Sequence, residues 1–180
     1  MSAKNTFEVP FLEEERLAAL HRYRVLDTAP EPVFDELAFL AGAICGTPIA
    51  LITLVDAERQ WFKARIGLDA VETPRGVAFC THAILGHGVM VIPDARQDVR
   101  FHDNLLVTGP PHIRFYAGAP LRTLEDLALG TICVIDRVPR VLSREQVHAL
   151  KSLSHLVVAQ LEARRRELES GHDPEKKSAA

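Results

Sequence analysis

The fold class of this chain follows from two apolar segments, Phe115-Tyr-Ala-Gly-Ala-Pro-Leu121 and Gly130-Thr-Ile-Cys-Val-Ile-Asp136, which a polar turn joins. Strands that are apolar on both faces lie in the middle of a sheet that is covered on each side. The first strand carries Ala117, Gly118 and Ala119, and small residues in a buried strand often mark the close approach of a ligand or another backbone. The two segments therefore predict a covered sheet with a hollow on one face.

The composition indicates a single globular domain. The chain has 180 residues, 47% of them hydrophobic, and a formal net charge of −3. This charge argues against nucleic-acid binding, which needs a clustered positive surface. No segment approaches the roughly 18 continuous apolar residues of a membrane span. Three cysteines form no paired spacing, which is typical of a reducing compartment. We therefore expect a cytoplasmic protein with neither nucleic acid nor membrane as a partner.

The order of elements predicts an α+β domain with an antiparallel sheet. Periodicity and turn residues predict helices over 13–25, 34–44, 77–85 and from 143 onward, and strands over 49–56, 60–66, 89–92, 115–121 and 130–136. In the second strand, Trp61 and Lys63 are expected on one face, and Phe62 and Ala64 on the other. Residues 1–12 are expected to be a flexible N-terminus, 13–170 one domain and 171–180 a disordered tail.

Several stretches together resemble one known family, the GAF domains of bacterial sensory proteins. The resemblance spans roughly residues 17–161. The stretches that carry it are Arg22-Tyr-Arg-Val-Leu-Asp-Thr-Ala-Pro30, Pro48-Ile-Ala-Leu-Ile-Thr-Leu-Val-Asp56, Arg59-Gln-Trp-Phe-Lys63, Phe79-Cys-Thr-His-Ala-Ile84, Val91-Ile-Pro-Asp-Ala95, Pro110-Pro-His-Ile-Arg-Phe-Tyr-Ala-Gly-Ala-Pro120 and Gly130-Thr-Ile-Cys-Val-Ile-Asp136. The chain looks like the subgroup found beside histidine kinases and diguanylate cyclases. The fold implied is a central antiparallel sheet of five or six strands, with helices on one face and a ligand hollow on the other.

GAF domains share a frame and differ in ligand, so the resemblance implies a class of function and no particular ligand or cofactor. We expect a sensory domain that binds a small molecule or partner and signals through terminal helices in a homodimer, without being an enzyme. Its output would pass to a separate histidine kinase or diguanylate cyclase, or the chain is a piece of a longer protein. Two alternatives are a thiol redox enzyme or sensor, similar to free methionine sulfoxide reductases, and a dimerisation module without ligand.

Cys80 carries the redox alternative. Cys80 and His82 could form a reactive thiolate, but side chains two residues apart on a helix point away from each other. The structural interpretation is a buried thiol in the core, because free cysteine is among the most buried residue types. Cys45 and Cys133 are likewise expected to be core residues, so Cys80 has no evident resolving partner.

The polar segment 94–104 supplies the other candidate ligand contacts. Its arginines could receive a carboxylate or phosphate, whereas the structural alternative is a solvated loop with internal salt bridges and Asx turns. Phe115 and Tyr116 must point to opposite faces of their strand, so one of them lines the hollow. No histidine or acid spacing is diagnostic of a metal, and no metal site is expected. The residues expected to line the hollow are Cys80, Asp94, Arg100, Asn104, Arg114 and Tyr116.

The last helix is expected to run past the sheet. Ser143 and Gln146 form a capping box that opens it. The stretch 162–170 is almost entirely charged, so only the first part of the helix is expected to pack on the core. We expect the first and last helices to build the dimer as a parallel bundle.

Overall fold

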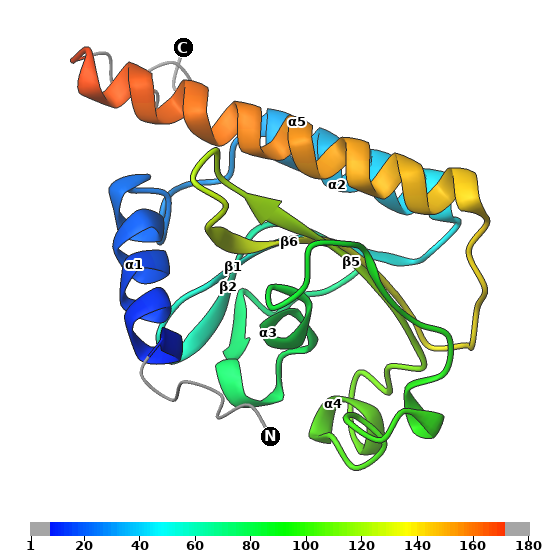
Figure 1. Ribbon diagram of the computed structural model, residues 1–180. Coiled ribbons are helices and arrows are strands. Elements are labelled where there is room, and N and C mark those ends of the chain that lie inside the picture. The colour runs from blue at the N-terminus through cyan, green and yellow to red at the C-terminus, as the bar shows by residue number, and fades with distance from the viewer. Residues whose placement is uncertain (1–7, 172–180) are drawn as a thin grey trace.

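The computed structural model describes the backbone of residues 8–171 and the side chains of residues 12–171. One antiparallel sheet has the strand order β3-β2-β1-β6-β5-β4 (Figure 1). The strands are β1 (Ile49–Val55), β2 (Arg59–Ile66), β3 (Glu72–Pro74), β4 (Met90–Ile92), β5 (Phe115–Arg122) and β6 (Ala128–Asp136). The predicted α+β class with five or six strands is confirmed, and β3 is a strand that the sequence did not predict.

Three longer helices and two short ones surround this sheet. They are α1 (Glu8–Arg22), α2 (Pro32–Cys45), α3 (Phe79–Ala83), α4 (Leu105–Thr108) and α5 (Arg144–Glu169). The first helix begins and ends earlier than the predicted 13–25. Most of the predicted flexible N-terminus and nearly all of the predicted tail lie outside the described residues, so both stay predictions.

Local signals account for the ends of α2 and α5. Gly46 adopts the left-handed conformation, with φ of 66°, and its N–H bonds back to the carbonyl of Gly42. Glycine adopts this conformation at little cost, which ends a helix. At the start of α5, Ser143 and Gln146 form the reciprocal capping box that the sequence predicts. The α5 helix passes over the sheet and projects beyond it at its C-terminal end (Figure 1).

The sheet separates two hydrophobic cores. The first core lies between the sheet and the layer of α2 and α5, and the second lies on the side of α3 and α4 (Figure 1). Phe115 belongs to the first core and Tyr116 to the second, which confirms that these neighbours point to opposite faces. Long helices cover the first face of the sheet, so a ligand is expected on the second face, which short helices and loops cover (Figure 1).

A β-bulge in β2 changes which side chains share a face. The register with β1 shifts between Ile52 and Thr53, so Ile52 pairs with Ala64 and Thr53 pairs with Phe62. Lys63 is therefore the extra residue. Ala64 joins Trp61 in the first core, so the predicted opposition of these two residues is wrong. The strict alternation fails because a bulge puts two consecutive side chains on one side of the strand.

The hollow expected beside the small residues of β5 is filled by the chain itself. A Cβ placed on Gly118 would lie 2.1 Å from the Tyr116 hydroxyl oxygen. Tyr116 is completely buried, and its ring packs against Phe79 with the ring centres 5.2 Å apart. A side chain at position 118 would therefore clash with the Tyr116 ring, which occupies the space that Gly118 leaves. The cavity of the second core lies elsewhere.

Candidate functional site: the second face of the sheet

A cluster of sulfur and hydroxyl groups lies at the centre of the second core. Cys80 on α3 receives hydrogen bonds from the hydroxyls of Tyr116 and Thr131, whose oxygens lie 3.2 and 3.0 Å from its sulfur. The Cys133 sulfur on β6 lies 3.9 Å from the Cys80 sulfur. All of these residues are buried. We call this group of four residues the sulfur cluster.

The polar neighbours of Cys80 alter its acidity. Burial raises the pKa of the Cys80 thiol, but hydrogen bonds from Cys133, Thr131, Thr53 and Tyr116 outweigh it and hold this pKa below its ordinary value. The pKa of Cys133 is raised, first by its hydrogen bond with Cys80 and second by burial. Within the cluster, Cys80 is thus the thiol that loses its proton more readily.

Cys80 and His82 do not act together. Cys80 is buried in the second core, whereas His82 is exposed and meets the Phe101 ring edge-on, with the ring centres 4.8 Å apart. Burial lowers the pKa of His82. The predicted burial of Cys80 is confirmed, as is that of Cys45 and Cys133. Cys133 was not predicted as a neighbour of Cys80, because the two thiols come from a helix and a strand that are far apart in the chain.

Within the polar segment, carboxylates and guanidinium groups pair with near neighbours in the chain. Asp94 binds Arg96 with a shortest distance of 2.7 Å, and Asp98 binds Arg100 at the same distance. Each arginine lowers the pKa of its partner aspartate. The structural alternative, a solvated loop with internal salt bridges, describes these contacts well.

The other two predicted polar residues hold the backbone of the same region. Asn104 accepts a hydrogen bond from the Leu106 N–H at the start of α4 and donates one to the carbonyl of Val77. Arg114 donates to the carbonyls of Val107 and Ile113. Of the six residues predicted to contact a ligand, Cys80 and Tyr116 are brought together by the hydrogen bond of the sulfur cluster. A role of these six residues in ligand binding stays a prediction.

An apolar cavity of about 290 Å³ borders the second core, and none of the six residues predicted to contact a ligand lines it. Its floor comes from β1, β2 and β6, with Leu51, Phe62 and Ile135. Leu106 and Ile113, from the segment that contains α4, also line it. None of the lining side chains carries a charge. This cavity was not predicted, since apolar lining residues look the same as core residues in a sequence.

On the first face, a buried ion network joins β2, the segment between α1 and α2, and α5. Lys63 donates to the Glu31 carboxylate at 2.6 Å, and Arg164 donates to the same oxygen at 2.9 Å. Arg164 also donates to the carbonyls of Tyr23 and Arg24. We call Lys63, Glu31 and Arg164 the Glu31 network. It corrects the expectation that the charged end of α5 stays off the core, because the Arg164 side chain is only 5% exposed.

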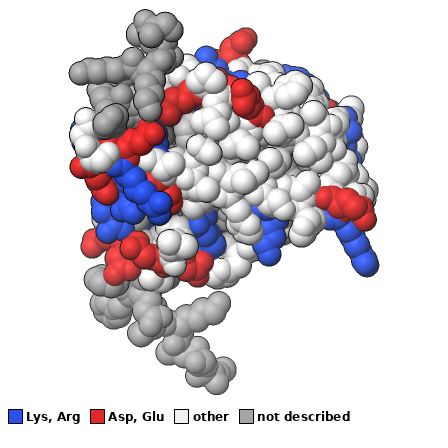
Figure 2. All heavy atoms as spheres, turned by 90° about the horizontal axis from the view of Figure 1, so that it is seen from above, with Lys and Arg blue, Asp and Glu red and all other residues white. Residues whose placement is uncertain are grey.

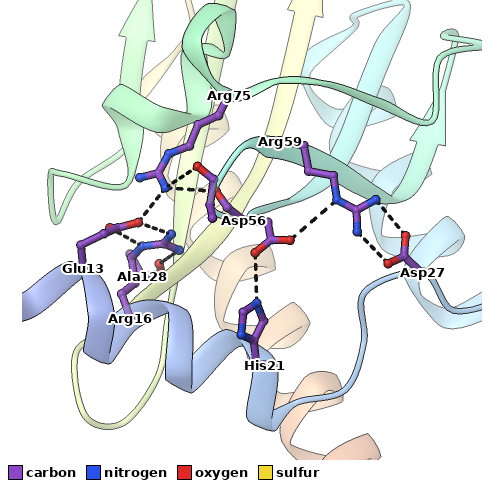
Figure 3. A network of polar contacts seen from close by, with 9 residues as sticks. Glu13, Arg16, His21, Asp27, Asp56, Arg59, Arg75 and Ala128 are labelled. Carbon is purple, nitrogen blue, oxygen red and sulfur yellow. Dashed lines mark hydrogen bonds and ion pairs between the residues drawn. The ribbon is translucent and has the colours of Figure 1, made fainter.

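A second set of ion pairs fastens the same segment to the β1–β2 turn (Figure 3). Arg59 binds both carboxylate oxygens of Asp27, at 2.9 and 2.6 Å. His21 of α1 and Asp56 of the turn lie 3.0 Å apart. Two of the stretches that carry the family resemblance, 22–30 and 59–63, are therefore held together by these side chains. Their role in the structure is to attach the first two helices to the sheet.

The outer surface of α2 and α5 is largely uncharged. Seen from above these helices, Lys, Arg, Asp and Glu side chains lie mostly toward the edges of a broad uncharged area (Figure 2). The large apolar side chains that these two helices expose are Phe39, Leu40 and Ile44 on α2 and Leu156 on α5, which are 42–60% exposed. We call these four residues the α2–α5 patch. Large contiguous apolar patches are typical of surfaces that contact a partner.

The family model for the GAF domain matches residues 29–161, which is most of the chain. This chain belongs to the GAF domain family. The described helices include none with the length and apolar character needed to cross a membrane. Among the described residues, no group of three or more His, Cys, Asp or Glu side chains could hold a metal ion.

A curated relative of this GAF domain is a cyclic di-GMP phosphodiesterase of Pseudomonas aeruginosa, which is 48% identical over 155 residues. The match covers 84% of this chain but 26% of the relative, so the chain spans about a quarter of that protein. The relative is named as an enzyme, which contradicts the expectation that this chain is not an enzyme. The expectation was wrong because it rested on the residues of this one domain.

Solved structures share the fold at low sequence identity. A free methionine-R-sulfoxide reductase from Neisseria meningitidis superposes with a TM-score of 0.62 at 16% identity, covering 92% of this chain and 97% of the other. The chromophore-binding domain of a bacteriophytochrome from R. palustris gives a TM-score of 0.58 at 16% identity, covering 92% and 64%. At this identity the similarity establishes the fold alone.

Proposed function

We propose that this GAF domain is the sensory part of a protein that hydrolyses cyclic di-GMP, and that it sets the rate of hydrolysis. The observation that carries the proposal is the 48% identity to a cyclic di-GMP phosphodiesterase of which the chain covers 26%. A domain that makes up about a quarter of the length of an enzyme can regulate the catalytic part of the same chain. The three thiols are free, which supports a reducing compartment such as the cytoplasm.

The Glu31 network supports α5 as the output element. Arg164 ties the C-terminal half of α5 to the segment between α1 and α2, while Lys63 ties the same carboxylate to β2. A change in β2 that altered this network would favour a different position of α5. Signalling would then be a population shift between two helix arrangements, driven by a ligand that binds one of them better.

The α2–α5 patch supports a homodimer. The sequence predicts a dimer built by the first and last helices, and within one chain α2 lies beside α5 (Figure 1). A second copy that covers Phe39 and Leu156 would bury both side chains and place two α5 helices together. We expect Phe39→Glu and Leu156→Glu to give monomers by light scattering. Leu124→Glu, at a 93% exposed turn residue, is the control and should not change the mass. A wild-type monomer at high concentration would rule out this dimer.

A chimera tests the regulatory proposal. This chain would replace the matching segment of the Pseudomonas aeruginosa relative, and hydrolysis of cyclic di-GMP would be compared with a version that lacks the segment. We expect the chimera and the deletion to differ in rate. Arg164→Met in the chimera should change the rate in the direction of the deletion, whereas Arg166→Met, at an exposed position of the same helix, should not. Equal rates for the chimera and the deletion would contradict the proposal.

The sulfur cluster favours a second candidate, a thiol sensor. The sequence offered no resolving partner for Cys80, whereas the Cys133 sulfur lies 3.9 Å away. A hydroperoxide would take one hydrogen from each thiol, giving a disulfide, water and an alcohol, or two waters from hydrogen peroxide. The sulfurs would have to approach to about 2.05 Å. Both thiols are buried, so the oxidation requires a local opening of the second core.

Mass spectrometry distinguishes this candidate. Hydrogen peroxide should remove two hydrogens from the wild-type chain and from Cys45→Ser, but should give no internal disulfide in Cys133→Ser. A wild-type chain that keeps three alkylatable thiols after the treatment would eliminate the thiol sensor. A dimerisation module without ligand would show neither the disulfide nor any binding at the cavity described above.

A further inference from the structure

The apolar cavity in the second core contains one polar group without a partner. Gln60 lines the cavity and is 5% exposed. Its amide nitrogen donates weakly to the Thr73 hydroxyl across the β2–β3 pair, at 3.4 Å. Its carbonyl oxygen is buried and has no hydrogen-bond partner among the described residues. Buried carbonyl oxygens nearly always accept a hydrogen bond, so this oxygen indicates a partner that the chain itself does not supply.

The strand geometry explains why this amide belongs to the cavity. Gln60 and Phe62 are two residues apart on β2, so their side chains point to the same face. Phe62 belongs to the second core, and both residues line the cavity. On the edge strand β3, Thr73 is the residue that pairs with Gln60 and accepts the hydrogen bond from its amide nitrogen. The cavity is therefore lined mainly by apolar side chains, and the Gln60 carbonyl oxygen is its buried side-chain acceptor without a partner among the described residues.

We propose that this cavity binds a small, uncharged and largely apolar molecule that donates one N–H or O–H hydrogen bond to the Gln60 carbonyl oxygen. Its volume of about 290 Å³ is at the small end of the range of roughly 300–1,000 Å³ for ligand sites. Apolar ligand atoms would contact Leu51, Phe62 and Ile135, and the single donor would satisfy the buried amide. This proposal rests on the proposed function, because the bound molecule would be the signal that the domain senses.

The lining excludes charged ligands as a class for this cavity. A nucleotide, phosphate or carboxylate would have to lose its hydration without meeting a cationic side chain, and no lining residue carries a charge. The arginines of the polar segment are engaged elsewhere: Arg100 binds Asp98, and Arg114 binds backbone carbonyls. Cyclic di-GMP itself is therefore not the ligand of this cavity.

Two probes that differ in one donor test the proposal. Indole and benzofuran have the same ring size, but benzofuran has an oxygen in place of the N–H group. We would titrate each into the ¹⁵N-labelled chain and follow amide resonances. Indole should give saturable shifts near Gln60, Leu106 and Ile113, with an affinity about tenfold higher than that of benzofuran, which corresponds to one hydrogen bond.

Three variants separate the hydrogen bond from the apolar contacts. Gln60→Leu should bring indole to the affinity of benzofuran, because the acceptor is gone. Gln97→Leu makes the same change at an exposed residue and should keep the tenfold preference. Ala70→Phe places a large ring at an exposed lining position and should abolish binding of both probes without disturbing the core.

The outcomes also separate this proposal from the regulatory one. If neither probe gives saturable shifts at the cavity, or if both bind equally and Gln60→Leu changes nothing, the assigned ligand class is wrong. The chimera with the Pseudomonas aeruginosa relative is measured independently of the probes. Binding at the cavity in a domain that leaves hydrolysis unaffected would overturn the regulatory role alone. A regulatory chimera whose cavity binds neither probe would overturn the ligand class alone.

Discussion

Replacing Arg164 by Met removes the α5 side of the Glu31 network while keeping a long side chain at that position. Three hydrogen bonds are lost, at 2.9 Å to Glu31 and at 3.1 and 2.9 Å to the carbonyls of Tyr23 and Arg24. These acceptors lie against a side chain that is only 5% exposed, so water replaces the lost donor poorly. The variant should therefore lose much more stability than a surface arginine variant.

The expected magnitude follows from the surroundings of Glu31. Removing one partner of a buried ion pair costs about 3–5 kcal/mol. Glu31 is 23% exposed and keeps its bond to Lys63, which places the loss at the lower end. We expect the free energy of unfolding to fall by about 3 kcal/mol. For a domain of this size, this loss lowers Tm by about 6–12 °C.

Urea and thermal unfolding of Arg164→Met and Arg166→Met provide the comparison. Both substitutions remove one positive charge from the same helix, but Arg166 is exposed, and its loss should cost less than about 0.5 kcal/mol. The difference between the variants should persist at high salt, because buried pairs are screened less than exposed ones. Equal losses for the two variants would refute the reasoning that the network holds α5 in place.

Two further predictions concern packing and pH. Gly118→Ala should lower the free energy of unfolding by about 1–3 kcal/mol, measured with urea, because the new Cβ would lie 2.1 Å from the Tyr116 hydroxyl oxygen. Gly88→Ala is the control: its Cβ would meet nothing within 4 Å, so its stability should be close to that of wild type. The Arg16 guanidinium lowers the pKa of Glu13 to about 2 (Figure 3). This group therefore stabilises the fold above its unfolded pKa of about 4.3 and loses that contribution as pH falls toward 2. Wild type should thus lose more stability than Glu13→Gln between pH 5 and pH 2, and equal losses would contradict the role of this pair.

The β-strands and helices were predictable where local patterns decided them. The apolar strands β5 and β6, the glycine that ends α2 and the capping box of α5 all depend on residues that are close in the chain. The alternation on β2 was predicted wrongly at Ala64, since a bulge depends on pairing with β1 and leaves no mark in β2 itself. The family resemblance was also readable, because its motifs keep their order and spacing along the chain.

The candidate site was predictable to a smaller extent. The sequence draws attention to polar residues, and it therefore indicated Asp94, Arg100 and Arg114 as ligand contacts. In the structure these groups bind near neighbours or backbone carbonyls. Gln60 attracted no attention, because a single glutamine in a strand is unremarkable until its carbonyl oxygen is found buried without a partner.

The α+β class, the central antiparallel strands and the family could be predicted, because hydrophobic periodicity, turn residues and motif spacing are local properties. Three features became visible only in the folded chain: Tyr116 fills the space beside Gly118, Cys133 lies next to Cys80, and Gln60 lines an uncharged cavity. These features arise where strands and loops far apart in the chain meet. Their distances depend on register and packing, which no single segment encodes.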